Sequence, residues 1–408
     1  MPAPLEFPSE PGRVVGVRAE VEWSSPAGRG RAEFPLRLVA TGPGVAKEAT
    51  VLVANPLLNS PSSWVAVEVP VPRDLKGRPF SVVDESGAEV PMEVYGDKLR
   101  FVCSLGPGEA KRFRLVRRVL PLEPTSDLVA TAHRLGTGEG LAVVGNSAAV
   151  FVFDERFGGF LSWMAPRGDK MGYAVAPGGA LIVEYDLGEG RKRRLSERAG
   201  RIRLLRRGAT KVELEAYVED EYLRVVDRWA FRPGSPVALL DREVIVKRPV
   251  KFWDLSVALL RLRDEPFARF WPNGVGKVIK GRKRCWLETW YIEDGYLAVG
   301  RLGRETAEAG CGPISGLVVL DKGPIFRVRY GFFEGEAQIR LRARKVYKGG
   351  EVVRLRLGVV CGRDLGWKWA KYLRDSLLHP PLVAMWGGGA RFVNYRPIQV
   401  PPPYVMPY

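Results

Sequence analysis

Cysteine and histidine are scarce in this 408-residue chain, and their scarcity argues against several kinds of site. The four cysteines show no C-x-x-C spacing, so they supply neither a zinc site nor a disulfide framework. They are Cys103, Cys285, Cys311 and Cys361. Of the two histidines, His133 falls in a predicted loop and His379 closes a predicted helix, and neither has an evident carboxylate partner for acid catalysis. We expect no metal site and no cofactor.

Long apolar runs and targeting signals are also missing. No run of about 18 apolar residues occurs, and Met1–Ala19 has neither the basic nor the apolar region of a signal peptide. The glycines of Gly136–Gly140 are followed by neither a helix nor a lysine, which excludes a phosphate-binding loop. We expect a cytoplasmic protein that does not enter the membrane. Glutamine occurs only at Gln338 and Gln399, which is typical of a thermophilic source.

Glycine and proline, in contrast, are plentiful. The 46 glycines and 32 prolines favour many short strands and turns over long helices. A hydrophobic content of 46% indicates a globular chain. Because 408 residues exceed the usual limit of one hydrophobic core, we expect two or more packed units.

The formal net charge of +17 has three interpretations. Nucleic-acid binding is the weakest, because the basic residues are dispersed along the chain. Many of them alternate with apolar residues, as in Arg201–Leu204 and Arg340–Arg342, which is typical of solvent-facing strand positions. The third interpretation is attraction of an acidic ligand such as a uronate polysaccharide.

The stretch Gly145–Trp163 predicts the inner hairpin of a large β-sandwich. Val150 and Val152 alternate with Phe151 and Phe153, so both faces of the first strand are apolar, as in a strand buried between two layers. The following Asp154–Gly159 supplies turn residues before the apolar run resumes.

Alternation of apolar and polar residues predicts an all-β protein in three parts. Residues 1–120 form an Ig-like β-sandwich of short antiparallel strands. After a proline-stiffened linker, residues 127–362 form a larger set of antiparallel strands in two covering sheets. Residues 363–408 hold one predicted helix, Leu365–Leu378, and a Pro/Gly-rich tail that lies along the sandwich surface or caps a partner.

Several of these motifs resemble family 38 glycoside hydrolases, the α-mannosidase type. The likeness runs through Asn55-Pro56-Leu57, Val65–Val71, Val83–Pro91, Leu99–Phe101 and Leu105–Glu109, in the order of the family's linker sandwich. Asn146–Trp163 resembles the first strands of its galactose-mutarotase-like supersandwich. The resemblance implies a small N-terminal sandwich followed by a large antiparallel supersandwich. It also implies that the family's catalytic barrel, with its metal ligands and Asp nucleophile, is absent from this chain.

Arg269–Tyr296 is the densest stretch of aromatic and charged residues. Sugar sites combine flat aromatic faces with charged or amide groups that hold hydroxyls. The predicted substrate-binding residues are Trp253, Trp271, Asn273, Trp286, Trp290 and Tyr296. The candidate catalytic residues are Tyr291, Lys277, Arg282 and Glu288. The alternative is that the tryptophans only fill the sandwich core.

Three function hypotheses follow. The first is a carbohydrate-recognising or carbohydrate-processing protein that resembles the non-catalytic β-region of α-mannosidases, as in the β-subunit of a split glycosidase with its barrel on a separate chain. The second is a polysaccharide lyase, in which Asn273, Lys277 or Arg282 neutralises a uronate and Tyr291 or Lys277 takes the α-proton. The third is a structural or assembly subunit, including a homo-oligomer.

Overall fold

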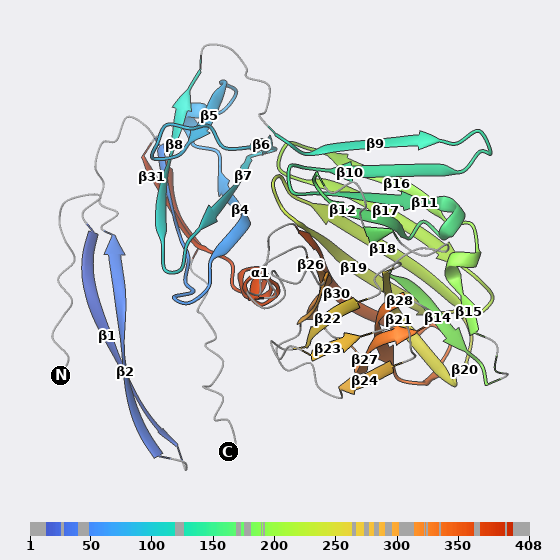
Figure 1. The fold of residues 1–408 in the computed structure, drawn as a ribbon. Helices are drawn as coiled ribbons and strands as arrows, with labels where there is room; N and C mark the ends of the chain where they lie inside the picture. The colour runs from blue at the N-terminus through green and yellow to red at the C-terminus, as the bar shows by residue number, and fades with distance from the viewer. Residues whose placement is uncertain are drawn as a thin grey trace.

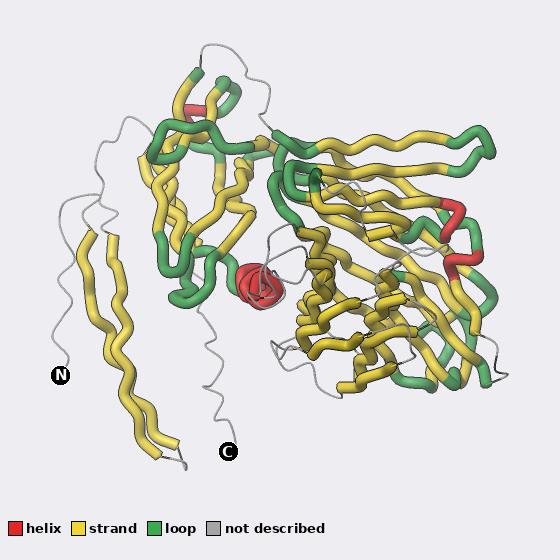
Figure 2. Tube along the Cα trace, in the orientation of Figure 1, coloured by secondary structure: helices red, strands yellow, loops and turns green. Residues whose placement is uncertain are grey.

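The structure is a computed structural model that describes most of the chain, and strands are its main elements (Figures 1 and 2). Of the described residues, strands take 62% and helices 6%. The predicted all-β class is therefore confirmed. The described residues are 14–25, 28–39, 49–118, 126–168, 173–174, 181–188, 190, 192–262, 267–272, 277–280, 285–289, 296–301, 314–321, 323, 325–333, 336–362, 368–387 and 390–394.

Two antiparallel sheets make the smaller sandwich. One has the strand order β32-β31-β3-β8-β5 and the other β4-β7-β6. Alternate residues of β3 are buried, and across the core the rings of Phe101 and Phe113 lie 4.9 Å apart. The elements are β3 Ala49–Ala54, β4 Ser62–Pro70, η1 Arg73–Leu75, β5 Phe80–Val83, β6 Met92–Tyr95, β7 Lys98–Leu105, β8 Ala110–Arg117, β31 Leu382–Gly387 and β32 Ala390–Asn394.

The C-terminal tail completes this N-terminal sandwich. β31 pairs with β3 from Thr50 opposite Trp386 to Ala54 opposite Leu382, and Val383 and Met385 enter the same core. Two further strands, β1 Val14–Ser25 and β2 Gly28–Val39, pair with each other as a long hairpin. From the sequence we predict no strand in the tail, because the short apolar run Leu382–Trp386 lies among prolines and glycines.

The larger sandwich contains three main sheets. Their orders are β16-β17-β18-β19-β30-β26-β25-β22-β23, β15-β14-β21-β28-β27-β24 and β13-β12-β11-β10-β9, with β20-β29 as a short pair. One continuous core joins them, from Phe151 and Phe153 through Trp229 to Leu341. The sequence predicts antiparallel strands in two covering sheets here, and the structure divides the strands among three main sheets.

The first half of the larger sandwich consists of β9 Val129–Arg134, β10 Gly140–Gly145, β11 Ala149–Asp154, η2 Glu155–Phe157, β12 Leu161–Pro166, β13 Tyr173–Ala174, β14 Ile182–Asp186, β15 Lys192–Arg194, η3 Leu195–Glu197, β16 Arg201–Arg207, β17 Val212–Glu219, β18 Leu223–Phe231 and β19 Val237–Val246. The second half consists of β20 Val250–Lys251, β21 Asp254–Leu262, β22 Phe267–Pro272, β23 Lys277–Lys280, β24 Cys285–Thr289, β25 Tyr296–Arg301, β26 Ile314–Asp321, β27 Ile325–Phe333, β28 Glu336–Ala343, β29 Val346–Tyr347 and β30 Val352–Gly362.

The predicted hairpin at Gly145–Trp163 is present as β11 and β12. Phe151 and Phe153 are fully buried, and the Phe153 ring meets Trp229 edge to face at 5.0 Å. Val150 and Val152 on the other face are half-buried, so that face is less buried than the sequence pattern predicts. His133 lies in β9, an exposed strand at the edge of this sheet, and not in the predicted loop.

Helix α1, Lys368–Leu378, lies between the two sandwiches (Figure 1). It contacts β4 of the smaller sandwich and β25 and β26 of the larger one. Leu373 packs with Val318 and Val360, and Asp375 Oδ2 accepts a hydrogen bond from the Ser60 hydroxyl at 3.1 Å. The predicted helix is confirmed from residue 368 onward. No helix of the described part is long and apolar enough to cross a membrane.

Candidate functional site

A row of charged side chains lies on one face of the six-stranded sheet. In β28, Ile339, Leu341 and Ala343 face the core, and the alternate residues lie on the opposite face because side chains alternate along a strand. These are Glu336, Gln338, Arg340 and Arg342, and none is more than 8% exposed. The charged row comprises these four residues with Lys192, Arg194, Glu184, Asp254 and Arg261 of β15, β14 and β21.

Glu184 is the centre of the charged row. It is 3% exposed and pairs with Arg340, with Arg194 Nε at 2.8 Å and with Lys192 Nζ at 3.9 Å. Burial alone would raise the pKa of Glu184, but the adjacent Arg340, the hydrogen bond from Arg194 and the charge of Lys192 outweigh it and hold that pKa below its ordinary value. Glu184 is therefore a permanent anion near neutral pH, suited to fixing charges and not to carrying a proton.

Arg261 sits at one end of the row. Its Nε and Nη2 donate to the two oxygens of Glu336 at 2.8 and 2.7 Å, a bidentate pair that fixes the guanidinium plane. Gln338 Nε2 donates to Glu336 at 2.9 Å, and its Oε1 accepts from Arg340 Nε at 3.2 Å. The remaining nitrogen, Arg261 Nη1, is buried and has no hydrogen-bond partner among the described residues. Such an atom needs a ligand or water to satisfy it.

The other end of the row is more open. Arg342 Nε donates to Asp254 Oδ1 at 2.6 Å, where the Asp254 side chain is 24% exposed. The neighbouring Trp253 is 67% exposed, and the Lys345 ammonium lies 5.0 Å from its ring centroid. The structure thus places Trp253, a predicted sugar-binding residue, beside the exposed end of the charged row.

The sequence interpretation of Arg340 and Arg342 is wrong. Their alternation with apolar residues predicts a solvated face, yet their exposed fractions are 4% and 7%. Arg201 and Arg203 have the same pattern and face solvent as predicted, with the Arg203 side chain 72% exposed. Alternation fixes which face a residue takes and not what covers that face.

The predicted segment Arg269–Tyr296 is divided between two sheets. β22, β23 and β25, which contain Trp271, Lys277 and Tyr296, belong to the nine-stranded sheet. β24, which contains Trp286 and Glu288, is the edge strand of the six-stranded sheet. The predicted residues Asn273, Arg282, Trp290 and Tyr291 lie outside the described residues.

Strand register connects β24 with the charged row. Arg261 pairs with Gln338, Gln338 with Gly331, and Gly331 with Trp286. One rung of the sheet therefore runs from Arg261 to the Trp286 position. Gly331 has no side chain, so only a glycine separates Gln338 from position 286, across about 9.5 Å at the usual strand spacing.

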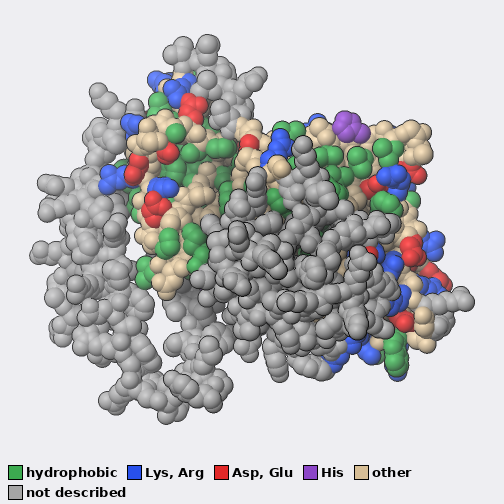
Figure 3. All heavy atoms as spheres, in the orientation of Figure 1, with side chains coloured by type: hydrophobic (Ala, Val, Ile, Leu, Met, Phe, Trp, Pro, Cys, Tyr) green, Lys and Arg blue, Asp and Glu red, His purple; other side chains and the backbone are tan. Residues whose placement is uncertain are grey.

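The row has an excess of positive charge, with five cationic side chains against three carboxylates. Over the rest of the described surface visible in Figure 3, basic and acidic side chains are interspersed and do not form one basic patch. Within the described part of the chain, no cluster of three or more His, Cys, Asp or Glu residues could hold a metal ion. The row is suited to binding polar and anionic groups through fixed donors.

Sequence reasoning missed Glu184, Arg261, Glu336, Gln338 and Arg340. The available signal was the run Glu336-Ala337-Gln338-Ile339-Arg340, in which both charge signs and one of only two glutamines alternate on one face. A mixed row of this kind is suited to mutual pairing at a buried surface. The sequence alone does not distinguish such a row from one on an exposed strand. Arg261 and Glu184 lie far from it in the sequence and are brought beside it by the fold.

Comparison of the sequence with protein-family models and with curated proteins finds no match. Solved structures do match the fold. A protein in the glycosyl hydrolase family 38 from Enterococcus faecalis aligns with 84% of this chain at 11% identity and a TM-score of 0.51. An alpha-mannosidase from Enterococcus faecalis V583 also aligns with 84% of the chain, at 11% identity and a TM-score of 0.51.

This chain is thus similar in fold to family 38 proteins, and the suspected resemblance is confirmed at the level of fold. The chain spans about half the length of these two proteins, 48% and 46%.

Proposed function

We propose that this chain recognises or processes carbohydrate, and that it does so at the β24 edge, where an acidic group of the sugar reaches the buried charged row. The observation that carries the proposal is Arg261 Nη1, a buried donor that Glu336 holds in a fixed plane and that no described residue satisfies. A donor that is already oriented and desolvated binds an anionic oxygen strongly, because little reorganisation remains to be made.

The rung from Arg261 to Trp286 supports a sugar as the ligand. Gln338 supplies amide chemistry, and the glycine at position 331 leaves the face without a side chain between Gln338 and position 286. An aromatic residue at position 286 and polar groups at 261 and 338 are the combination that sugar sites use. We propose Trp286 as the stacking residue of this surface and Trp253 as a second contact at its open end.

The charge of the row favours an acidic sugar. Glu184 and Glu336 are each neutralised by arginines, and the excess of cations leaves the surface positive. A uronate carboxylate placed against Arg261 Nη1 would complete the guanidinium's hydrogen bonds. An anionic polysaccharide is therefore the proposed ligand class, and the fold similarity to family 38 proteins agrees with a carbohydrate ligand.

Two roles are compatible with this surface. In the first, the chain is a recognition module or the β-subunit of a split glycosidase, with the barrel on a separate chain. In the second, it is a lyase: Arg261 neutralises the uronate, and Tyr291 or Lys277 takes the α-proton. A carbon–carbon double bond then forms as the bond to the leaving sugar oxygen breaks, and that oxygen takes a proton from the protonated base or from water. The observation that favours the second is the unsatisfied arginine donor, since carboxylate neutralisation is what such elimination requires.

Calorimetric titration with a tetrasaccharide of galacturonate tests the proposal. Arg261→Lys keeps the charge beside Glu336 but loses the planar fork, so we expect affinity to fall about tenfold or more. Arg203→Lys is the matched control, because Arg203 is an exposed arginine on the nine-stranded sheet, and its titration should equal that of the wild type. Equal affinity for Arg261→Lys and wild type would refute the assignment of the surface.

Absorbance in the ultraviolet separates the two roles. A lyase generates an unsaturated product from polygalacturonate, and Tyr291→Phe should abolish that signal while binding persists. Binding without product favours the recognition module. Absence of both binding and product across acidic and neutral oligosaccharides would leave the structural or assembly subunit as the correct hypothesis.

A further inference from the structure

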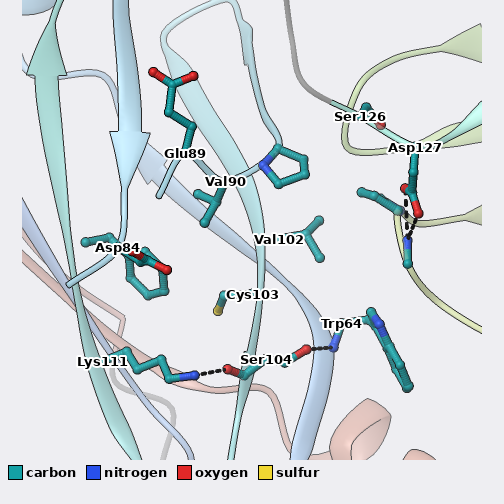
Figure 4. Close-up of a pocket in the computed structure, with 14 residues that line it drawn as sticks. Trp64, Asp84, Glu89, Val90, Val102, Cys103, Ser104, Lys111, Ser126 and Asp127 are labelled. Carbon is teal, nitrogen blue, oxygen red and sulfur yellow. Dashed lines mark hydrogen bonds between the residues drawn. The ribbon is translucent and has the colours of Figure 1, made fainter. Parts of the chain in front are cut away.

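A cavity of about 730 Å³ lies where the two sandwiches meet (Figure 4). None of its lining residues belongs to the charged row. The smaller sandwich contributes Asp84, Val102, Ser104 and Lys111 to its lining, and the larger one contributes Asp127 and Gly234. Sites for small ligands typically occupy clefts of about 300–1000 Å³ and often lie between domains. The volume is thus sufficient for one or two sugar rings.

The wall from the smaller sandwich is a preformed polar turn. Asp84 opens the turn of the hairpin Val83–Pro91, and its Oδ1 accepts hydrogen bonds from Ser86 N and Ala88 N, both at 2.9 Å, and from the Ser86 hydroxyl at 2.6 Å. All these bonds end on Oδ1, and Figure 4 shows the Asp84 carboxylate among the lining side chains. Asp84 Oδ2 accepts none of these turn hydrogen bonds and keeps its acceptor capacity.

Asp84 is charged at all ordinary pH values. The hydrogen bond from the Ser86 hydroxyl lowers the pKa of Asp84 most, slight burial opposes it, and the turn amides lower it further. Asp84 therefore offers a carboxylate whose orientation is fixed before any ligand arrives, as preorganised binding requires.

Donors lie close to this acceptor. Lys111 Nζ donates to the Ser104 carbonyl at 2.9 Å and lies 3.6 Å from Glu109 Oε2, which leaves a third ammonium hydrogen as a donor. The Ser104 hydroxyl oxygen accepts from Trp64 N at 3.0 Å, so its own hydrogen is available. Val102 and Phe113 provide apolar surface between the polar groups. Donors, an acceptor and apolar surface in one cleft match the hydroxyl edges and C–H faces of a sugar.

The opposite wall is fixed by contacts between the domains. Trp64 has a φ of 52°, a left-handed conformation that non-glycine residues rarely adopt. Its carbonyl accepts from Arg232 Nη1 at 3.0 Å, and its indole lies so close to Gly234 that an added Cβ would approach Nε1 to 3.2 Å. Asp127 accepts from Gly234 N at 3.1 Å. The cavity is therefore a defined space that exists only when both domains are in place.

The charges of the lining decide the class of ligand. Asp84 and Asp127 are carboxylates, Glu89 is a carboxylate paired with Arg118, and Lys111 is the one cation among the lining residues. We infer that this cavity is a second binding site, distinct from the charged row, for a sugar of one or two rings that is neutral or bears an amine and not a carboxylate. The two sites thus have opposite charge preferences, and a bound sugar at the junction touches both domains.

Three sugars with the same ring test the inference: glucosamine, glucose and glucuronate, each titrated by saturation-transfer NMR and competition. We expect glucosamine and glucose to bind and to compete with each other. Asp84→Asn keeps the turn, because the amide oxygen takes the same hydrogen bonds, but it replaces Oδ2 by a donor. That variant should weaken glucosamine binding about tenfold or more and remove its advantage over glucose.

Val102→Phe provides a second, steric variant. Val102 lines the cavity, and a phenyl ring there fills space that the sugar needs, so binding of glucose and glucosamine should be lost. Val94→Phe is the matched control, because Val94 is 44% exposed on β6 and outside the lining, and it should bind as the wild type does. Undiminished binding by both Val102→Phe and Asp84→Asn would overturn the inference, as would no binding of either sugar to the wild type.

The outcome is independent of the acidic-ligand proposal. Arg261→Lys should leave glucosamine binding unchanged, and Val102→Phe should leave the galacturonate tetrasaccharide titration unchanged. If glucuronate binds and Val102→Phe abolishes that binding, the charge argument for the cavity is wrong.

Discussion

Asp227→Asn should destabilise the larger sandwich more than any surface substitution, because Asp227 is the partner of a fully buried arginine. Arg242 on β19 donates to Asp227 on β18 through Nε at 2.7 Å, and also through Nη2. The same guanidinium crosses the core to the six-stranded sheet, where Nη1 donates to the Val257 carbonyl at 2.8 Å and Nη2 to the Leu181 carbonyl at 2.7 Å. The two residues are 1% exposed.

The expected magnitude follows from the unpaired charge. Removing one partner of a buried ion pair leaves the other without compensation and costs about 3–5 kcal/mol. Replacing both residues by apolar ones, Asp227→Leu with Arg242→Met, removes both charges together. It leaves the Val257 and Leu181 carbonyls without their donor, at about 1–3 kcal/mol each. The double variant should therefore lose less than the sum of the single variants.

Urea denaturation followed by circular dichroism measures Asp227→Asn and the four proteins of a double-mutant cycle, which are the wild type, Asp227→Leu, Arg242→Met and the double variant. We expect the single variants to lower the midpoint strongly and the coupling energy between the two sites to exceed 2 kcal/mol, on the order expected for contacting charges. Single variants within about 1 kcal/mol of the wild type, or additive effects, would show that the pair does not join the sheets energetically.

Three further predictions concern single sites. Glu93 joins the two sandwiches by accepting from Arg206 and Thr210. Glu93→Ala should lower the free energy of unfolding, measured by thermal denaturation, by about 1–2 kcal/mol, because the ion pair is partly exposed. The lowered pKa of Glu184 stabilises the fold above its unfolded pKa of about 4.3, so stability should fall as the pH drops below that value, and Glu184→Gln should flatten the acid limb of a stability–pH curve. Burial raises the pKa of Cys103 to about 12, so mass spectrometry should find this thiol unmodified by iodoacetamide at pH 8 in the folded protein and alkylated in urea; alkylation at equal rates in both states would contradict its burial.

Much of the fold was predictable from local patterns. Alternation in β3, β11 and β18 predicts strands because a sheet buries every second residue. The helix at Lys368–Leu378 follows from apolar spacing of three and four. In contrast, the pairing of β31 with β3 depends on contacts between residues more than 300 positions apart, which no local pattern encodes.

The candidate site was predictable only in part. The aromatic segment predicted Trp286, and the strand register places Trp286 on one rung with Arg261. Trp271 of β22, which the same segment predicted, belongs to a different sheet from Trp286 of β24. The charged row could not be recognised, because Arg340 in a covered face and Arg203 in a solvated face follow the same alternation. Burial of a polar face is decided by what packs above it, and that is a property of the whole fold.

Hydrogen exchange with and without the galacturonate tetrasaccharide locates the carbohydrate-binding surface without mutation. Exchange is slowed where a ligand stabilises or covers the backbone. We expect added protection in β21, β24 and β28, with β16 and β17 of the nine-stranded sheet unchanged. Saturating ligand that protects β16 and β17 but leaves β21, β24 and β28 unchanged would contradict the assignment of the charged row as the carbohydrate-binding surface.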